Sequence, residues 1–303
     1  MGLDAISQFF AGLLEEFCKN MYMDLKNIVL DLYNGMLDVM NAEIARANSA
    51  VTQSPEDWNS SAFGFIETIA DNAFIPVAGC ILTCVVAWEL ISMIDDRNHG
   101  HNVKMEEIIV WLSKVVICVG ACAYAFEIVM AFFEVSSIVS DRIAAASASG
   151  GNATLDSLDF ADPAVYNFGC VFTMIGNLLL VGACYIVTYI LAIMIVCRVW
   201  LWFLELLIHA APASIPFATF MNKEWGQVGT NFIRKMLAVC FEGFLMLIAF
   251  GLYKHVVTNI TGSGVISGGD FAYAMMMSVA SGGILFILLL KVGNISASIM
   301  NAH

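Results

Sequence analysis

Charged side chains are scarce in this chain. Only 13% of its 303 residues are Asp, Glu, Lys or Arg, whereas 60% are hydrophobic, and the mean hydropathy is +0.81. A water-soluble domain carries about 25% charged residues, because polar groups must cover its surface. The shortage of charge therefore argues against such a domain and predicts a protein whose outer surface faces lipid.

Positive charge is scarcer still. The chain has 13 Lys and Arg against 26 Asp and Glu, which gives a net charge of -13. Nucleic-acid grooves need clustered Lys and Arg, so any contact with DNA or RNA is expected to be narrow and local. The first residues, MGLDAISQFFAGLLEEF, carry acids and no early basic run, unlike a cleavable signal peptide. We therefore expect the N-terminus to stay in the mature protein.

Motifs of catalysis are missing from the sequence. It contains no GxSxG, no HExxH and no phosphate-binding glycine loop. Eight of the nine cysteines lie in or at apolar stretches, where cysteine behaves as a small hydrophobic residue. Cys80 and Cys84 are four residues apart, and so are Cys118 and Cys122, but no third or fourth metal ligand is apparent near either pair. We therefore interpret the two pairs as positions of close helix packing. We expect no enzymatic activity, no catalytic residue, no metal, no cofactor and no small-molecule substrate.

Long apolar runs are what the sequence does contain. A bilayer core about 30 Å thick requires roughly 20 apolar residues per helix. Five runs meet this length, and a sixth apolar segment at 199–220 is broken by Pro212 and Pro216. That segment either crosses the membrane or forms a re-entrant or interfacial piece. We predict an all-α, polytopic transmembrane helix bundle of about five spans, with six left open; the five runs are 72–94, 107–133, 168–196, 236–257 and 271–292.

The first 46 residues are amphipathic rather than membrane-spanning. Apolar residues recur at helical spacing, while Asp24, Asp31 and Asp38 repeat on another face. Packing against the same protein is favoured over membrane-surface binding, which normally uses a basic polar face, and docking of a partner stays open. Residues 47–61 resemble a polar linker. We predict an extracytoplasmic amphipathic helical region with linker at 1–61, and a transmembrane bundle at 62–303 with an external loop at 135–167.

Basic residues next to the spans predict the orientation, because cytoplasmic loops are enriched in Lys and Arg. With five spans and the N-terminus outside, seven counted residues lie inside, and Arg142 and Lys254 lie outside. Six spans would divide the same nine residues five to four. We therefore favour a cytoplasmic (inner) membrane protein with an extracytoplasmic N-terminus and a cytoplasmic C-terminus; the seven inside residues are Arg97, Lys104, Arg198, Lys223, Arg234, Lys235 and Lys291.

Several charged residues fall within the apolar segments. A charge at the middle of a bilayer costs roughly 2.5–3.5 kcal/mol on insertion scales, so it normally faces protein or water. These residues are candidates for a polar conduit or for pairing between helices. The other interpretation is that the side chain extends along the helix toward the water at the end of the span (snorkelling). This interpretation fits Lys114 and Glu89. The candidates are Glu89, Lys114, Glu127, Glu205 and Glu242.

Residues 211–248 form the most characteristic stretch. A proline-containing apolar segment precedes a short loop, and Arg234 and Lys235 then open a long span. This pattern resembles the TrbL/VirB-type polytopic membrane subunit of conjugative type IV secretion systems, most closely the version in conjugative elements of Gram-positive bacteria. The residues that carry the resemblance are Pro212, Pro216, Lys223, Glu224, Trp225 and Gly226.

The resemblance implies a non-enzymatic channel or scaffold subunit. Such a protein would assemble with other transfer subunits and with copies of itself, and would touch the transferred DNA only transiently. Separate ATPases would supply the energy for moving DNA or protein across the membrane. The competing hypothesis is a stand-alone secondary transporter or ion channel that uses the intramembrane carboxylates. Transporters often repeat their broken helices, whereas this sequence shows a break only near Pro212 and Pro216.

Cysteine labelling tests the predicted orientation. In intact cells an impermeant maleimide should label Ser147→Cys, which we place outside, and should not label Lys223→Cys, which we place inside. Both variants should react once the membrane is permeabilised, and the parent chain gives the background of the native cysteines. Equal labelling of the two positions in intact cells would contradict the five-span orientation.

Overall fold

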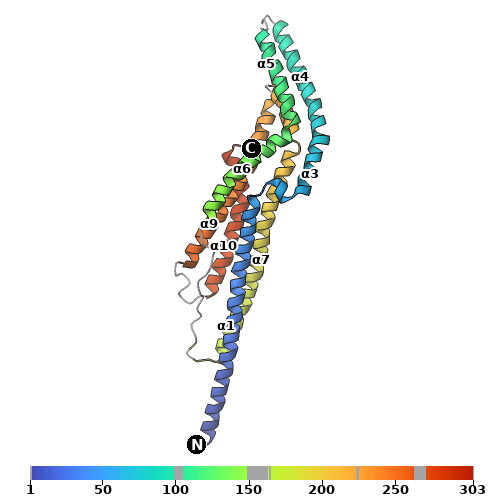
Figure 1. Ribbon diagram of the computed structural model, residues 1–303. Coiled ribbons are helices and arrows are strands. Elements are labelled where there is room, and N and C mark those ends of the chain that lie inside the picture. Colours follow the sequence, from blue (N-terminus) through green and yellow to red (C-terminus); the bar gives the residue numbers. More distant parts are fainter. Residues whose placement is uncertain are drawn as a thin grey trace. The chain divides into compact units, whose positions relative to one another are not determined.

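The computed structural model describes residues 2–98, 105–148, 163, 165–222, 225–262 and 271–302 (Figure 1). Helices form this part of the chain and no strand is found in it, which confirms the all-α prediction. The elements are α1 (Gly2–Val51), α2 (Pro55–Trp58), α3 (Ser60–Ile69), the π-helical turn η1 (Ala70–Phe74), α4 (Ile75–Asn98), α5 (Met105–Ala123), α6 (Ala125–Ala148), α7 (Phe168–Ala210), α8 (Ser214–Ala218), the 3-10 turn η2 (Thr219–Met221), α9 (Gly226–Gly262) and α10 (Phe271–Ile299).

Four helical stretches of the described chain are long and apolar enough to cross a membrane. The bent pair of α5 and α6 adds a fifth if its two arms make one span. The polytopic bundle predicted from the sequence is thereby confirmed, with four or five spans. The four stretches are Ser60–Asp95, Phe168–Met221, Gly226–Val256 and Phe271–Ile299.

The bend between α5 and α6 falls inside the run 107–133, which the sequence analysis treated as one span. The two arms, Ile108–Ala123 and Ala125–Ser140, meet at an angle of 73°. Beyond the bend, Phe126 is buried and its ring packs on Phe63 of α3, with 5.4 Å between the ring centroids. Apart from Glu127 in the first turn of α6, the residues next to the bend are apolar and include no proline, so hydropathy does not reveal the bend.

Residues 199–220 do not form a separate sixth span. α7 continues without interruption from Phe168 to Ala210, so the expected boundary near 196 is absent. The helix ends just before Pro212, and a short turn leads into α8. Proline has no N–H to donate and clashes with the preceding helical turn, which explains the position of this break. At 1.5 Å per residue α7 is about 64 Å long, roughly twice the ~30 Å bilayer core.

The segment predicted as a linker contains two capped helix starts. Ser54 accepts a hydrogen bond from the Asp57 N–H (3.1 Å) at the start of α2, where Pro55 occupies the first turn. Asn59 then accepts a hydrogen bond from the Ala62 N–H (3.0 Å) at the start of α3. The polar residues of this segment therefore begin new helices and do not form a long irregular connection.

The chain divides into two compact units. Unit 1 comprises Met1–Asn48, Ala146–Cys197 and Ala249–Leu289; unit 2 comprises Ser49–Ala145, Arg198–Ile248 and Leu290–His303. The core of unit 1 contains Tyr33 of α1, Val181 of α7 and Met275 of α10. The Tyr33 hydroxyl also shares a hydrogen bond with Ser278 of α10 (3.3 Å). From Cys18 onward α1 thus packs on its own protein, as expected, and Asp24, Asp31 and Asp38 remain exposed, whereas the large apolar side chains between Ile6 and Phe17 are exposed and do not pack in this way.

Unit 2 is built around two buried aromatic side chains of α7. Trp202 and Phe203 are each at most 1% exposed. The Phe203 ring stacks on Trp58 of α2, with 4.7 Å between the centroids, and Phe133 of α6 packs against both α7 rings. Gly243 of α9 lets the Trp202 ring approach its backbone, because a Cβ there would lie 2.7 Å from Cζ2 of that ring.

Replacing Gly243 by a branched residue tests this packing. Gly243→Val should destabilise the protein by about 1–3 kcal/mol, because the new methyl groups overlap the Trp202 ring. Thermal unfolding in detergent measures the change. Gly79→Val is the matched control, since a Cβ at Gly79 of α4 meets no atom within 4 Å. Equal melting temperatures for the two variants would show that Gly243 does not provide this space.

Candidate functional site

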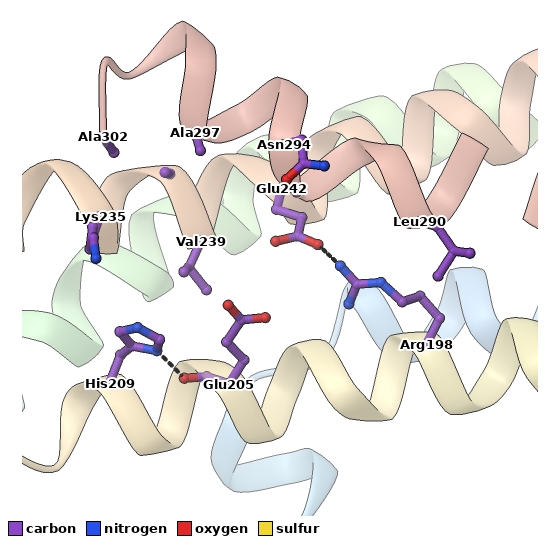
Figure 2. Close-up of a pocket in the computed structure, with 12 residues that line it drawn as sticks. Arg198, Glu205, His209, Lys235, Val239, Glu242, Leu290, Asn294, Ala297 and Ala302 are labelled. Atoms are coloured by element: carbon purple, nitrogen blue, oxygen red, sulfur yellow. Dashed lines mark hydrogen bonds and ion pairs between the residues drawn. The ribbon is translucent and has the colours of Figure 1, made fainter. Parts of the chain in front are cut away.

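A buried ion pair joins α7 to α9 within unit 2. The side chain of Arg198 is 10% exposed and that of Glu242 is 5% exposed. Nη2 of Arg198 donates a hydrogen bond to Oε1 of Glu242 (Figure 2). Charges removed from water remain ionised only when an opposite charge and hydrogen bonds replace the lost hydration. The pair therefore fixes these two helices against each other at this level.

Hydrogen bonds to the α9 backbone lie next to the ion pair. Nε1 of Trp202 donates to the Val239 carbonyl oxygen (2.8 Å), and the Ser296 hydroxyl of α10 donates to the Ala238 carbonyl oxygen. In a bilayer, lipid tails are as apolar as the side chains of a helix, so apolar contacts alone do not favour helix association over contact with lipid. Hydrogen bonds of this kind help to hold the helices together. Three helices, α7, α9 and α10, are thus joined within one turn of Glu242.

Glycine on α10 makes room for the buried carboxylate. A Cβ at Gly293 would lie 3.2 Å and 3.3 Å from the two carboxylate oxygens of Glu242. These distances are shorter than ordinary van der Waals contacts, so any larger residue at this position would crowd the carboxylate that Arg198 binds.

A cavity of about 350 Å³ lies beside the ion pair, between α7, α9 and α10. Arg198, Glu205 and His209 share one face of α7, because they are spaced by seven and four residues. Figure 2 shows the Glu205 carboxylate directed from α7 toward α9, and the His209 ring held by a hydrogen bond between Nδ1 and the Glu205 carbonyl oxygen (2.8 Å). The polar residues that line the cavity are Arg198, Glu205, His209, Lys235, Glu242 and Asn294.

One end of the Arg198 guanidinium has no protein partner. Nη1 is buried and donates no hydrogen bond to any described residue, although Nη2 is bound to Glu242. In Figure 2 this second terminal nitrogen is turned toward the space that the Glu205 carboxylate also faces. A guanidinium N–H left unbonded in a protein interior is costly, so this atom marks a place where a further acceptor is needed.

Only two of the five charged residues predicted from the sequence as candidates line this cavity. Glu205 and Glu242 line the cavity, whereas Lys114 of α5 and Glu127 of α6 are exposed and do not line it. Glu89 of α4 is half-buried, and its carboxylate accepts a hydrogen bond from the Asn222 side chain (3.1 Å). A single conduit lined by all five charges is therefore not formed at this cavity.

The residues of the sequence motif lie in the turn between α7 and α9. α8 packs against α4 and α5, and Gly229 approaches the Pro216 carbonyl oxygen so closely that a Cβ would lie 2.8 Å from it. Asn222 closes the turn by accepting a hydrogen bond from the Trp225 N–H (3.1 Å). Pro212 follows the end of α7 and Gly226 begins α9; Lys223 and Glu224 lie outside the described residues.

Arg198, His209, Lys235 and Asn294 were not predicted from the sequence as site residues. Arg198 and Lys235 each stand at the end of an apolar run and therefore entered the prediction of orientation, and Lys235 also belongs to the stretch that resembles the family. A signal was nevertheless present, since Arg198, Glu205 and His209 share a helix face and Glu242 needs a partner in an apolar helix. Which helix faces Glu242 is information that only the folded chain contains.

A comparison with protein families matches residues 40–214 to the family described as TrbL/VirB6 plasmid conjugal transfer like protein. The matched range covers more than half of the 303 residues. The chain belongs to this family. No curated protein and no solved structure matched it.

Membership in the TrbL/VirB6 family confirms the resemblance noted in the sequence. The matched range ends at Ser214, so the helices before the proline turn carry the match, and most of residues 211–248 lie beyond it. The family points to a subunit of a conjugal transfer apparatus that associates with other transfer proteins, and the apolar helices make it a multi-pass membrane protein.

A double-mutant cycle tests the role of the ion pair. Arg198→Met should destabilise the protein by about 3–5 kcal/mol, because it leaves the Glu242 carboxylate buried and unpaired. The double variant Arg198→Met/Glu242→Met should recover most of this loss, since no buried charge then lacks a partner. Thermal unfolding in detergent provides the measurement, with Arg234→Met on the exposed side of α9 as control. Additive losses in the double variant would contradict a direct pair.

Proposed function

We propose that this TrbL/VirB6-family protein is a channel or scaffold subunit of a conjugative type IV secretion apparatus in the cytoplasmic membrane. It would help DNA or protein substrates to cross that membrane. The observation that carries the proposal is the family match over residues 40–214, in a chain with four or five apolar helices suited to a bilayer.

The arrangement of charge in unit 2 supports a passive role. Arg198 and Glu242 bind each other, and Glu89 binds Asn222, so these polar groups connect helices. Groups held in such contacts stabilise a bundle, whereas a catalytic acid or base must be able to reach a substrate. We therefore propose that the protein is not an enzyme and that separate ATPases drive the transfer.

Exposed charges on apolar helices support assembly with other chains. Lys114 of α5 is exposed, and its neighbours Leu112, Val116 and Ile117 are 56%, 66% and 69% exposed. A charged group that faces lipid near mid-bilayer costs roughly 2.5–3.5 kcal/mol on insertion scales. Burying this surface against another transfer subunit or a second copy would remove that cost.

The cavity of unit 2 supports the proposed orientation. Arg198 and Lys235 both line it, and so does Leu290, which directly precedes Lys291. The distribution of basic residues assigns all three basic positions to the cytoplasmic side. The three apolar spans that end at these residues meet at one cavity, which supports placing all three ends on the same side of the membrane. We propose an extracytoplasmic N-terminus and a cytoplasmic C-terminus.

Gene deletion tests the proposed function. An in-frame deletion should abolish conjugative transfer without slowing growth, and the gene supplied in trans should restore transfer. Complementation with Arg198→Met should fail, because the destabilised bundle no longer assembles, whereas complementation with the Arg198→Met/Glu242→Met variant should succeed.

The experiment measures mating frequency, growth rate and the amount of protein in the membrane. The amount of protein shows whether a variant fails because it is absent from the membrane or because it is present but does not support transfer. Normal transfer from the deletion strain would refute the proposal. Transfer that fails together with growth would point instead to a general transport function.

A further inference from the structure

The cavity beside Arg198 and Glu242 has the features of a binding site. Its volume of about 350 Å³ falls within the range of small-molecule sites, roughly 300–1,000 Å³. The small residues Gly293, Ala297 and Ala302 form part of its wall and leave the space open. The Arg198 side chain is 10% exposed, and its Nη1 has no hydrogen-bond partner among the described residues. A buried donor without a partner in the chain can bind an acceptor from outside it, either a water molecule or an atom of a ligand.

The charges that face the cavity have both signs. On the positive side are Nη1 of Arg198 and the ammonium of Lys235, for which the described part of the chain shows no ion pair. On the negative side are Glu242, which is paired with Nη2 of Arg198, and Glu205, whose carboxylate makes no ion pair among the described residues. A simple anion would be repelled by Glu205, and a simple cation would be repelled by Arg198 and Lys235. A ligand that carries one charge of each sign matches both sides.

The position of the cavity along the helices points to a lipid. Arg198 follows the apolar run 168–196, Lys235 precedes the run 236–257, and Leu290 lies at the end of the run 271–292. Basic residues at the ends of apolar spans lie at the level of the lipid headgroups. Leu290 is 51% exposed and offers an apolar surface at the rim for the first part of an acyl chain.

We propose that this cavity binds the zwitterionic headgroup of a phospholipid with a primary ammonium, namely phosphatidylethanolamine. Nη1 of Arg198 and Nζ of Lys235 donate hydrogen bonds to the phosphate oxygens. The lipid ammonium donates to the Glu205 carboxylate. Glu242 keeps its bond to Nη2, and one guanidinium can serve both acceptors because it has five N–H donors. The bound lipid would thus join α7, α9 and α10 at the bilayer surface.

Lipid binding to the purified full-length chain tests the proposal. Native mass spectrometry in mild detergent counts phosphatidylethanolamine, phosphatidylglycerol and phosphatidylcholine retained at matched concentrations. Phosphatidylethanolamine should bind about tenfold more tightly than the other two, because it alone has a positively charged N–H donor for the Glu205 carboxylate: the choline headgroup has no N–H, and the glycerol headgroup donates only from neutral hydroxyls. Equal retention of the three lipids would overturn the proposal, and so would no specific retention, which would mean that the cavity holds only water.

Two variants with matched controls separate the two halves of the site. Glu205→Gln should lower the affinity for phosphatidylethanolamine and raise that for the anionic phosphatidylglycerol, because the carboxylate that binds the ammonium and repels an anion is gone, so the preference between the two lipids should disappear. Glu127→Gln, outside the cavity, should change neither affinity. Lys235→Gln should weaken both lipids several-fold, whereas its neighbour Arg234→Gln should not. Glu205→Gln and Lys235→Gln alter groups without an ion pair in the described chain, so both variants should melt like the parent. A Glu205→Gln variant that keeps the lipid preference would overturn the assignment.

Free phosphoethanolamine distinguishes a lipid from a soluble ligand with the same charges. It should compete only weakly, because it lacks the acyl chain that rests on the rim. Competition at the concentration that suffices for the lipid would overturn the lipid assignment in favour of a soluble zwitterion. These measurements use purified protein and do not depend on conjugation. A failure of the lipid proposal can therefore be distinguished from a failure of the proposed function, which the mating test measures.

Discussion

Charge placed among apolar helices must find a partner, and in unit 2 this requirement is met by Arg198 and Glu242. The pair lies where α7, α9 and α10 meet, and its neighbours are adapted to it. Gly293 leaves space for the carboxylate, and Trp202 and Ser296 donate hydrogen bonds to the α9 backbone close by. Both charged side chains are largely removed from solvent by the packed helices, so each of these contacts favours this particular arrangement of helices.

This constraint also explains how a chain without catalytic motifs can serve in a transfer apparatus. The proposed scaffold role requires helices with a defined packing and a surface that other chains can cover. The buried contacts of unit 2 supply the first, and the exposed apolar faces of α5 and α7 provide surface for lipid or partners. The TrbL/VirB6 family assignment places these features in conjugal transfer.

Several elements of the fold follow directly from residues that a reader of the sequence can identify. The apolar runs mark the membrane helices, and the helical spacing of residues such as Tyr33 and Met36 marks the packed face of α1. Pro212 marks the end of α7. The bend near Tyr124 could not be found in this way, because no proline interrupts the run and the single charge beyond the bend, Glu127, does not end the apolar stretch. The uninterrupted length of α7 was missed for a related reason: Arg198 was taken to close the helix, although it only ends the apolar stretch.

By itself the sequence determined that this is a helical membrane protein with few charges, a proline break before its fourth apolar run, and a likeness to conjugation subunits. Those properties depend on local composition and spacing, which the linear chain contains in full. Only the tertiary structure decided that Arg198 binds Glu242, that Glu205 faces the same cavity, and that Lys114 and Glu127 do not. Helices far apart in the sequence must pack before such partners exist, and hydropathy does not specify which faces meet.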